Sequence, residues 1–380
     1  ELIVTYQDEM DDSYLNTVLS LLDQEVFKRP KNKLKVVYTS LYGTGRDFVQ
    51  GLLKKKLGID FHMVEEQAPF DGDFPTVSSP NPEDTEALDM AVQKASRLEA
   101  DLVMGTDPDS DRLGVIIRHQ GEYVMLNGNQ LGIVMLGYLL SRRNLERRKH
   151  YVVSTIVSSD MVIPMCEKAA LDLYVTLTGF KYIGGILTNK EGDADRFLFG
   201  FEESYGYLNG DYIRDKDGVS AAGLVCEVAQ ALKDEGKTLM DYLEELFLQY
   251  GYYRESLSSF TLKGQEGNEK IEQIINYFRE EVQTELFGMP VLKKLDLKLG
   301  QKWEHGALEP FHDFPKSNVL VFYLAPHFKL AVRPSGTEPK IKLYFGINNY
   351  QNRPVSQIIL KNELQNFENS ILEGVKKLLS

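Results

Sequence analysis

Segments with strand-like and helix-like patterns alternate through most of this 380-residue chain. Short apolar runs such as 34–38 and 113–117 stand between stretches whose apolar residues recur three and four positions apart, such as 128–140 and 218–232. This alternation is typical of α/β folds in which most strands pair in parallel. From about residue 251 the order changes to a helix, several strands and a closing helix, which is typical of an α+β layer.

The order of elements therefore predicts two consecutive α/β domains with mixed, largely parallel sheets, followed by a smaller α+β domain at the carboxyl end. The length supports more than one domain, because a single hydrophobic core rarely grows beyond roughly 250–300 residues. We place the boundaries near residues 120 and 250, which gives the domains 1–120, 121–250 and 251–380.

Net charge and cysteine content narrow the classes of partner. The formal net charge of −13 argues against nucleic acid as the main partner, because phosphate backbones require a basic face. A small phosphorylated substrate needs only a local pocket and stays compatible with this charge. No apolar run approaches the length that spans a bilayer, so we expect no membrane partner. Cys166 and Cys226 show neither metal-ligand spacing nor a disulfide pattern, which favours the cytoplasm.

Three aspartates at alternate positions, Asp107, Asp109 and Asp111, stand between two apolar runs and are followed by Arg112. In an extended loop such alternate residues point the same way, so the carboxylates can converge on one point. Converging carboxylates repel one another unless a hard divalent cation lies between them. The motif lacks the Gly at position 6 and the Glu at position 12 of a calcium-binding loop, which favours magnesium that serves phosphate chemistry. A solvated acidic turn is the alternative interpretation.

A second polar motif, 200–207, directly follows an apolar run. Its Glu202 and Ser204 can hydrogen-bond a polyol, because carboxylate oxygens accept from sugar hydroxyls. A charged turn without a ligand is the alternative. Lys216 stands just before a predicted helix whose N-cap is Asp217. Such a lysine is usually a solvated charge, but it can also exchange a proton with a sugar hydroxyl.

The motif 333–340 lies between two apolar runs and combines groups that bind anions. Arg333 offers a planar fork for a phosphate, and Gly336 lets backbone amides approach an anion. Ser335 and Thr337 add two hydroxyls. A plain hairpin turn is the alternative, but such a turn requires neither the arginine nor the paired hydroxyls.

Two further segments resemble functional loops but are predicted to be structural. Segment 192–196 imitates the aspartate motif with only two carboxylates, and we interpret it as a polar loop. Segment 78–82 resembles a nucleophile loop, but no base stands near it in the sequence. Its prolines favour a rigid loop that leads into a helix.

Taken in order, the motifs resemble those of the α-D-phosphohexomutases, the phosphoglucomutase and phosphomannomutase superfamily. Within it the chain is most similar to the bacterial phosphoglucomutases that are related to phosphopentomutases. The resemblance covers essentially the whole chain and implies that it corresponds to the second, third and fourth of the family's four domains, with 1–28 as the helix that leaves the first. It rests on seven segments: 38–45, 79–83, 106–112, 177–181, 201–207, 214–218 and 333–340.

The resemblance implies a role for each matched residue. Asp107, Asp109 and Asp111 would bind Mg²⁺. Arg112 would contact the transferring phosphoryl group, and Lys216 would be a candidate acid or base. The other matched residues would bind substrate, with sugar contacts from Thr178, Gly179, Glu202 and Ser204 and phosphate contacts from Arg333, Ser335, Gly336 and Thr337.

The implied activity is Mg²⁺-dependent interconversion of glucose 1-phosphate and glucose 6-phosphate. It would proceed through a phosphoserine and a bisphosphorylated sugar, which is both intermediate and activator. Phosphopentomutases and phosphomannomutases share every motif, and a non-catalytic protein that binds sugar phosphates is an alternative of another class. We expect a monomer or a homodimer.

Two departures from the family pattern matter. The histidine that many members carry in the sugar loop is replaced by the sequence Tyr205, Gly206 and Tyr207, so that contact is not carried over. The serine loop of the type Thr-Ala-Ser-His-Asn-Pro is absent, and Ser79 matches a different loop of the family. The chain starts at Glu1, so we expect it to begin in mid-protein, after processing, or where order begins. Without the nucleophilic serine, we expect this chain by itself to be inactive.

Overall fold

The structure is a computed structural model in which the chain divides into two compact units. The first unit holds Glu1–Ser158 and Val162–Leu246, and the second holds Ser159–Met161 and Phe247–Ser380. The first unit thus includes most of both predicted α/β domains. The structure describes residues 6, 8–143, 145, 149–262, 264–282, 284–335, 340–349 and 357–379.

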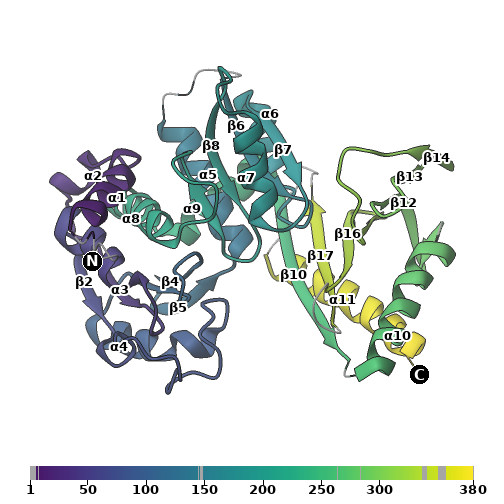
Figure 1. The fold of residues 1–380 in the computed structure, drawn as a ribbon, viewed down its shortest axis with the longest axis horizontal. Coiled ribbons are helices and arrows are strands. Elements are labelled where there is room, and N and C mark those ends of the chain that lie inside the picture. Colours follow the sequence, from purple (N-terminus) through teal and green to yellow (C-terminus); the bar gives the residue numbers. More distant parts are fainter. Residues whose placement is uncertain are drawn as a thin grey trace, which may run out of the picture. The chain divides into compact units, whose positions relative to one another are not determined.

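The first sheet of the amino-terminal unit has the strand order β2-β1-β3-β4-β5 (Figure 1). Strand β1 pairs in parallel with β2 and β3, whereas β3–β4 and β4–β5 are antiparallel. The sheet is therefore mixed, because a short loop such as the one between β3 and β4 can join only antiparallel neighbours. The strands are β1 Lys35–Thr39, β2 Asp60–Met63, β3 Leu102–Thr106, β4 Leu113–His119 and β5 Glu122–Leu126. The helices are α1 Asp8–Ser20, α2 Glu25–Lys28, α3 Gly45–Gln50, the π-helix Gly51–Lys56, the 3-10 helices Glu65–Gln67 and Thr85–Leu88, and α4 Asp89–Leu98.

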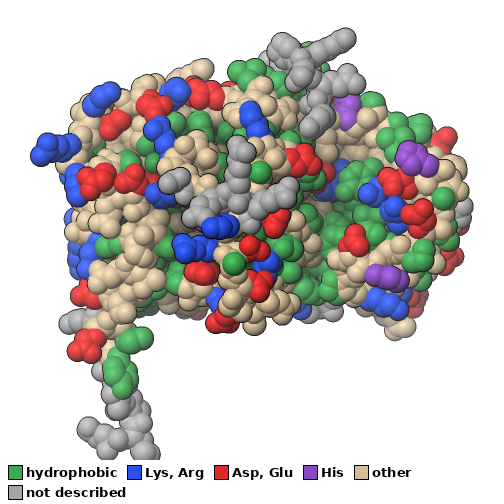
Figure 2. Space-filling model, turned by 90° about the horizontal axis from the view of Figure 1, so that it is seen from above, with side chains coloured by type: hydrophobic (Ala, Val, Ile, Leu, Met, Phe, Trp, Pro, Cys, Tyr) green, Lys and Arg blue, Asp and Glu red, His purple; other side chains and the backbone are tan. Residues whose placement is uncertain are grey.

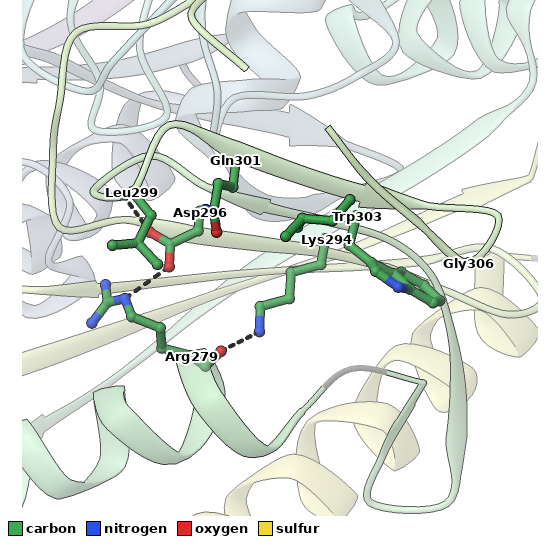
Figure 3. Close-up of a pocket in the computed structure, with 8 residues that line it drawn as sticks. Arg279, Lys294, Asp296, Leu299, Gln301, Trp303 and Gly306 are labelled. Carbon is green, nitrogen blue, oxygen red and sulfur yellow. Dashed lines mark hydrogen bonds and ion pairs between the residues drawn. The ribbon is translucent and has the colours of Figure 1, made fainter. Parts of the chain in front are cut away.

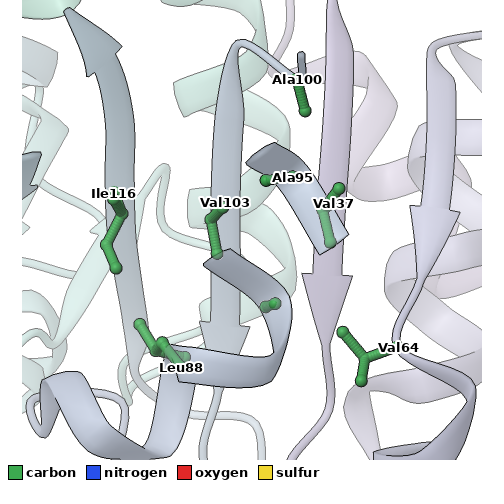
Figure 4. Close-up of a cluster of buried hydrophobic side chains, with 8 residues drawn as sticks. Val37, Val64, Leu88, Ala95, Ala100, Val103 and Ile116 are labelled. Atoms are coloured by element: carbon green, nitrogen blue, oxygen red, sulfur yellow. The ribbon is translucent and has the colours of Figure 1, made fainter. Parts of the chain in front are cut away.

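Helix α4 packs on β1 and β3 and covers one face of this sheet. Its Ala95 and the preceding Leu88 are fully buried against Val37 and Val103 of these strands (Figure 4). The small side chain of Ala95 lets the helix approach the strands closely, as close packing of protein interiors requires. This packing holds the end of β3, where the aspartate loop begins.

The second sheet has the order β7-β6-β8-β9, with two parallel pairs and an antiparallel pair at β8–β9. Parallel pairing follows from the helical crossovers between β6, β7 and β8. The strands are β6 His150–Thr155, β7 Asp172–Thr176, β8 Arg196–Phe201 and β9 Tyr207–Asn209. The helices are α5 Gly128–Arg142, α6 Val162–Ala169, α7 Phe180–Asn189, α8 Gly218–Asp234 and α9 Leu239–Tyr250.

Helix α8 joins the two sheets, since it contacts both β4 and β9. Its residues are almost all buried, which explains the predominance of Ala, Val and Leu in its sequence. The predicted N-cap is confirmed: Asp217 Oδ1 accepts hydrogen bonds from the backbone N–H groups of Val219 at 2.8 Å and Ser220 at 3.0 Å. The capped end of α8 therefore fixes the chain directly after Lys216.

The carboxyl-terminal unit contains one sheet of order β10-β17-β16-β15-β12-β13-β14, in which every pair is antiparallel. Helices α10 and α11 pack on each other, α10 on β16 and β17 and α11 on β10 and β17, as expected for an α+β layer. The helices are α10 Gly264–Asn276, the π-helix η4 Tyr277–Glu281 and α11 Gln357–Leu379. The strands are β10 Tyr252–Thr261, β11 Glu285–Leu286, β12 Met289–Asp296, β13 Gln301–Glu304, β14 Ala307–Pro310, β15 Leu320–Leu324, β16 Phe328–Pro334 and β17 Lys340–Asn349.

A pocket of about 340 Å³ lies in this unit, beside β12 and β13 (Figure 3). Its charged groups have partners within the protein: Arg279 Nε lies 2.8 Å from Asp296 Oδ2, and Lys294 Nζ donates to the backbone carbonyls of Arg279 and Val282. Burial lowers the pKa of the Lys294 ammonium to about 8. These contacts join η4 to β12, so we assign the pocket a structural role. It is lined by Arg279, Lys294, Asp296, Leu299, Gln301, Trp303, Gly306 and Leu308.

Acidic and basic side chains are interspersed on the face of the molecule shown in Figure 2. On this face neither sign of charge gathers in one patch. Among the described residues, no helix combines the length and apolar character needed to cross a lipid bilayer.

The carboxyl-terminal unit also contains a half-buried acidic residue, Glu255 on β10. The pKa of Glu255 is raised to about 7, chiefly by burial and also by the charge of Asp160, while a hydrogen bond with Ser159 and the charges of Lys329 and Arg254 oppose the rise. Asp160 is itself paired with Lys329, whose Nζ lies 2.5 Å from Asp160 Oδ1. Glu255 Oε1 is buried and has no hydrogen-bond partner among the described residues. A group of this kind favours the protonated form in the folded protein.

We predict that Glu255→Gln makes the stability of this unit less dependent on pH. The folded pKa of about 7 exceeds the ordinary 4.5, so the folded state binds more protons and stability falls as pH rises from 4.5 to 7. The loss should amount to about 2–4 kcal/mol, at about 1.4 kcal/mol per pH unit. Calorimetry at pH 5 and pH 8 measures it, with Glu309→Gln on the exposed strand β14 as the control. An equal pH dependence in Glu255→Gln and wild type would contradict the assignment.

Candidate metal and sugar-phosphate site

The aspartate loop is the tight connection between the antiparallel strands β3 and β4. Thr106 pairs with Leu113, and the Ser110 N–H donates to the Asp107 carbonyl at 2.9 Å. Ser110 adopts a φ of +60°, which turns the loop back on itself. One oxygen from each of the three carboxylates lies within 4.8 Å of the others. This cluster consists of Asp107, Asp109 and Asp111.

The negative charges of Asp107, Asp109 and Asp111 repel one another. The pKa of Asp107 is raised to about 7, chiefly by burial and also by the charges of Asp111 and Asp109, against a hydrogen bond from the Arg112 N–H. Three hard oxygen donors in one place suit Mg²⁺ or Ca²⁺ and offer nothing that soft metals prefer. A divalent cation would remove the repulsion and lower the pKa of Asp107. The donor set therefore fits a hard divalent cation.

Arg112 connects the aspartate loop to two other segments. Its backbone N–H donates to Asp107 Oδ1 at 2.9 Å, and its Nε lies 3.6 Å from Asp107 Oδ2 and 3.9 Å from Asp111 Oδ1. Its Nη1 lies 2.5 Å from Glu83 Oε1. Its backbone forms an isolated antiparallel bridge with Gly206 of the polar motif 200–207. The guanidinium is thus held beside the cluster.

The polar motif 200–207 packs directly against the aspartate loop within the same unit. The Leu113 N–H donates to the Tyr205 carbonyl at 3.0 Å. Glu202 is buried, and its Oε1 accepts from the Gly179 N–H at 2.5 Å. Burial raises the pKa of the Glu202 carboxyl, while this hydrogen bond and the charges of Lys216 and Arg112 oppose the change. Glu202 therefore links the loop that begins at Thr178 to the site.

Lys216 reaches the cluster from the segment before α8. Its Nζ lies 2.5 Å from Asp111 Oδ2 and 3.5 Å from Asp215 Oδ1. Burial tends to lower the pKa of this ammonium, but the hydrogen bond and charge of Asp111 outweigh burial, so the pKa is raised. Lys216 is therefore protonated near neutral pH, which suits a proton donor or a cationic contact better than a base.

Not every residue predicted for the site lies in this unit. Arg333 and Ser335 stand at the end of β16 in the carboxyl-terminal unit, where the Ser335 N–H donates to the Lys340 carbonyl at 2.7 Å. Gly336 and Thr337 lie outside the described residues. Ser204 in segment 200–207 and Thr178 in segment 177–181 are half-buried.

Glu83 is a site residue that the sequence did not reveal. Glu83 ends segment 79–83, one of the segments on which the family resemblance rests, but the resemblance assigned it no role and nothing in its spacing indicates a partner. Only the folded unit shows that its carboxylate contacts Arg112, 29 residues further along the chain. A charged residue at the end of a rigid proline loop is a weak signal that could have drawn attention to it.

The fold and the acidic loop define an α/β protein in which three carboxylates that could hold a metal ion follow the first sheet's strand β3, next to the segment 200–207 of the second sheet. Residues 12–121 match the sequence family described as phosphoglucomutase/phosphomannomutase, alpha/beta/alpha domain II, and residues 127–250 match its domain III. The chain belongs to the phosphoglucomutase/phosphomannomutase superfamily.

The chain is also similar to curated relatives and solved structures. It is 37% identical over 350 residues to a phosphoglucomutase of Staphylococcus epidermidis, which covers 91% of this chain and 63% of the relative. It is 37% identical over 347 residues to that of Staphylococcus aureus, covering 91% and 62%. The open form of the phosphoglucomutase parafusin from Paramecium matches with a TM-score of 0.66 at 16% identity, over 97% of this chain and 62% of that chain. The chain thus spans less than two thirds of these relatives.

Proposed function

We propose that this chain forms the metal- and sugar-binding part of a Mg²⁺-dependent phosphoglucomutase that interconverts glucose 1-phosphate and glucose 6-phosphate. One observation carries the proposal: three converging carboxylates lie beside Arg112 and Lys216. Next to them, the buried Glu202 links the segments 177–181 and 200–207, which we call the sugar loops. The names of the staphylococcal relatives support the same activity. A cytoplasmic location and a monomeric or homodimeric state stay predictions.

Each residue of the site has a role in this proposal. A bound Mg²⁺ would be held by Asp107, Asp109 and Asp111 and would supply positive charge beside the transferring phosphoryl group. Arg112 would contact the same group and share its charge, because phosphoryl transfer depends mainly on positioning and electrostatic stabilisation. Lys216, protonated by its contact with Asp111, would donate a proton to a sugar oxygen.

Other residues of the chain would hold the sugar and its second phosphate. Glu202 would accept hydrogen bonds from sugar hydroxyls, together with Ser204 and the loop that begins at Thr178. Arg333 and Ser335, together with Gly336 and Thr337, would hold the phosphate that is not reacting. A sugar that carries two phosphates would be both the intermediate and the activator. Either of its phosphates must then be able to occupy the site of transfer.

We further propose that the nucleophilic serine belongs to a domain outside these 380 residues, in the part of the relatives that this chain does not cover. We call the gene product that joins such a domain to this sequence the full-length mutase. The function is tested by assaying it with glucose 1-phosphate, mannose 1-phosphate and ribose 1-phosphate. Turnover of the pentose alone would favour a phosphopentomutase, a reading that the Tyr205-Gly206-Tyr207 sequence leaves open.

We predict that the 380-residue chain by itself binds Mn²⁺ and glucose 1-phosphate but does not turn the sugar over. The physical reason is that the described site residues offer ligands and charge, whereas the sequence does not contain the serine loop of the Thr-Ala-Ser-His-Asn-Pro type that would supply the nucleophile. Calorimetry measures binding, and coupling to glucose 6-phosphate dehydrogenase measures turnover. Turnover at rates typical of enzymes would refute this prediction and direct attention to Ser79. Failure of the chain to bind any sugar phosphate would instead contradict the proposed function.

A further inference from the structure

The guanidinium of Arg112 has a partner that belongs to neither the aspartate loop nor the sugar loops, namely Glu83. We propose that Glu83 is a positioning residue that sets the orientation of Arg112 toward the transferring phosphoryl group. The inference deepens the proposed function and rests on it for the identity of that group. The fixed orientation of Arg112 itself follows from the contacts of the folded chain.

The contacts of Arg112 lie on two sides of its guanidinium. Nη1 lies 2.5 Å from Glu83 Oε1, whereas Nε lies 3.6 Å from Asp107 Oδ2 and 3.9 Å from Asp111 Oδ1. The strong, short contact is therefore the one with Glu83, and the contacts with the aspartates are loose. A planar group that is held at two edges by different loops has little freedom to rotate.

The loop that carries Glu83 is itself held in place. The Glu83 N–H donates to Asn81 Oδ1 at 3.1 Å, and the Asp84 N–H donates to the Asn81 carbonyl at 3.0 Å. The loop lies close against β4, because a Cβ atom at Gly114 would stand 2.3 Å from the carbonyl oxygen of Pro82. Gly114 follows Arg112 by two positions, so glycine there lets the Glu83 loop reach the arginine.

The ion pair itself is not expected to add much stability. The side chains of Arg112 and Glu83 are 35% and 26% exposed, and ion pairs this accessible to water contribute little to folding. A role in orientation explains the contact better. Without Glu83, the nearest carboxylates to the guanidinium would be Asp107 and Asp111, which it would approach in competition with the cation.

The kinetic test compares Glu83→Gln with wild type in the full-length mutase. We expect kcat to fall about tenfold or more, since misplacing a catalytic group by about 1 Å can cost about 100-fold, while KM for glucose 1-phosphate stays within about twofold. In an Arg112→Lys background the same change should cause no further loss, because the two residues act as one unit. Glu99→Gln breaks a comparable exposed pair with Arg118, 3.0 Å long, and should leave kcat unchanged.

A second measurement needs no turnover. In the 380-residue chain, ¹⁵N NMR of the Arg112 side chain should show a slowly exchanging Nε–H and restricted rotation in wild type, and fast averaging in Glu83→Gln. Wild-type kcat in Glu83→Gln, or unrestricted rotation in wild type, would overturn the proposal. Restricted rotation in the wild-type 380-residue chain, together with no turnover of any sugar phosphate by the full-length mutase, would refute the proposed function and leave the orientation of Arg112 by Glu83 standing. The melting temperature of each variant shows whether it is folded, and Glu83→Asp provides a charged substitute should Glu83→Gln unfold.

Discussion

The Asp109→Asn variant is expected to lose most of the divalent cation binding of this chain. The change removes one of three converging charges and replaces it with a neutral amide, while the backbone of the exposed loop tip is unaffected. We expect Mn²⁺ affinity to fall about tenfold or more, because even changes outside the direct ligands of a metal cost about 10–100-fold. Electron paramagnetic resonance of free Mn²⁺ measures this in the 380-residue chain. In the full-length mutase, kcat should fall with it.

The segment 192–196 supplies a matched control. Its Asp195 stands in a similar sequence, which we interpret as a polar loop. Asp195 Oδ2 lies 3.1 Å from Lys190 Nζ and so has a cationic partner within the protein. Asp195→Asn should therefore leave Mn²⁺ affinity unchanged. Equal losses in Asp109→Asn and Asp195→Asn, or no loss in either, would show that the cluster is not the cation site.

The second large effect is expected from Arg333→Ala in the full-length mutase. A mutase must hold the phosphate that is not reacting in two opposite orientations of the sugar, so the contact should recognise phosphate rather than sugar. A charge-assisted contact of this kind contributes about 1.5–3 kcal/mol, or roughly 10- to 150-fold in KM. We therefore expect KM to rise by a similar factor for the phosphates of glucose, mannose and ribose.

The KM changes in Arg333→Ala are to be compared with those in Glu202→Gln. Glu202 is proposed to bind sugar hydroxyls, and it also holds the loop at Gly179 through a hydrogen bond of 2.5 Å. Its replacement should act unequally on the three sugars, since their hydroxyls differ in position. Steady-state kinetics of both variants with three sugar phosphates decide the matter. Equal discrimination among sugars by Arg333→Ala and Glu202→Gln would refute the proposed division of roles.

The sequence predicted local features of the site well because they depend on neighbouring residues. Convergence of the three aspartates follows from alternate spacing in a short loop between two strands, and the structure brings their oxygens within 4.8 Å. The N-cap at Asp217 likewise needs only the backbone N–H groups of Val219 and Ser220, two and three positions further along the chain. Local geometry of this kind is largely independent of the rest of the fold.

Parts of the fold were harder to predict from sequence. The strands β12, β13 and β14 were not predicted, although they extend the sheet of the carboxyl-terminal unit. All four residues of β14 are exposed, so the strand lacks the alternation of buried and exposed residues that marks a strand in a sequence. Its pairing with β13 is visible only once both segments are placed.

The amino-acid sequence by itself determined the α/β order of the chain, the aspartate cluster and the family to which the chain belongs. Only the tertiary structure brought Lys216 to Asp111, Gly179 to Glu202 and Glu83 to Arg112, because these residues come from segments far apart in the sequence. Such contacts depend on how α8, the two sheets and the proline loop pack together. This packing cannot be read from periodicity or spacing in the sequence. It places around the aspartates the charged side chains on which the proposed chemistry depends.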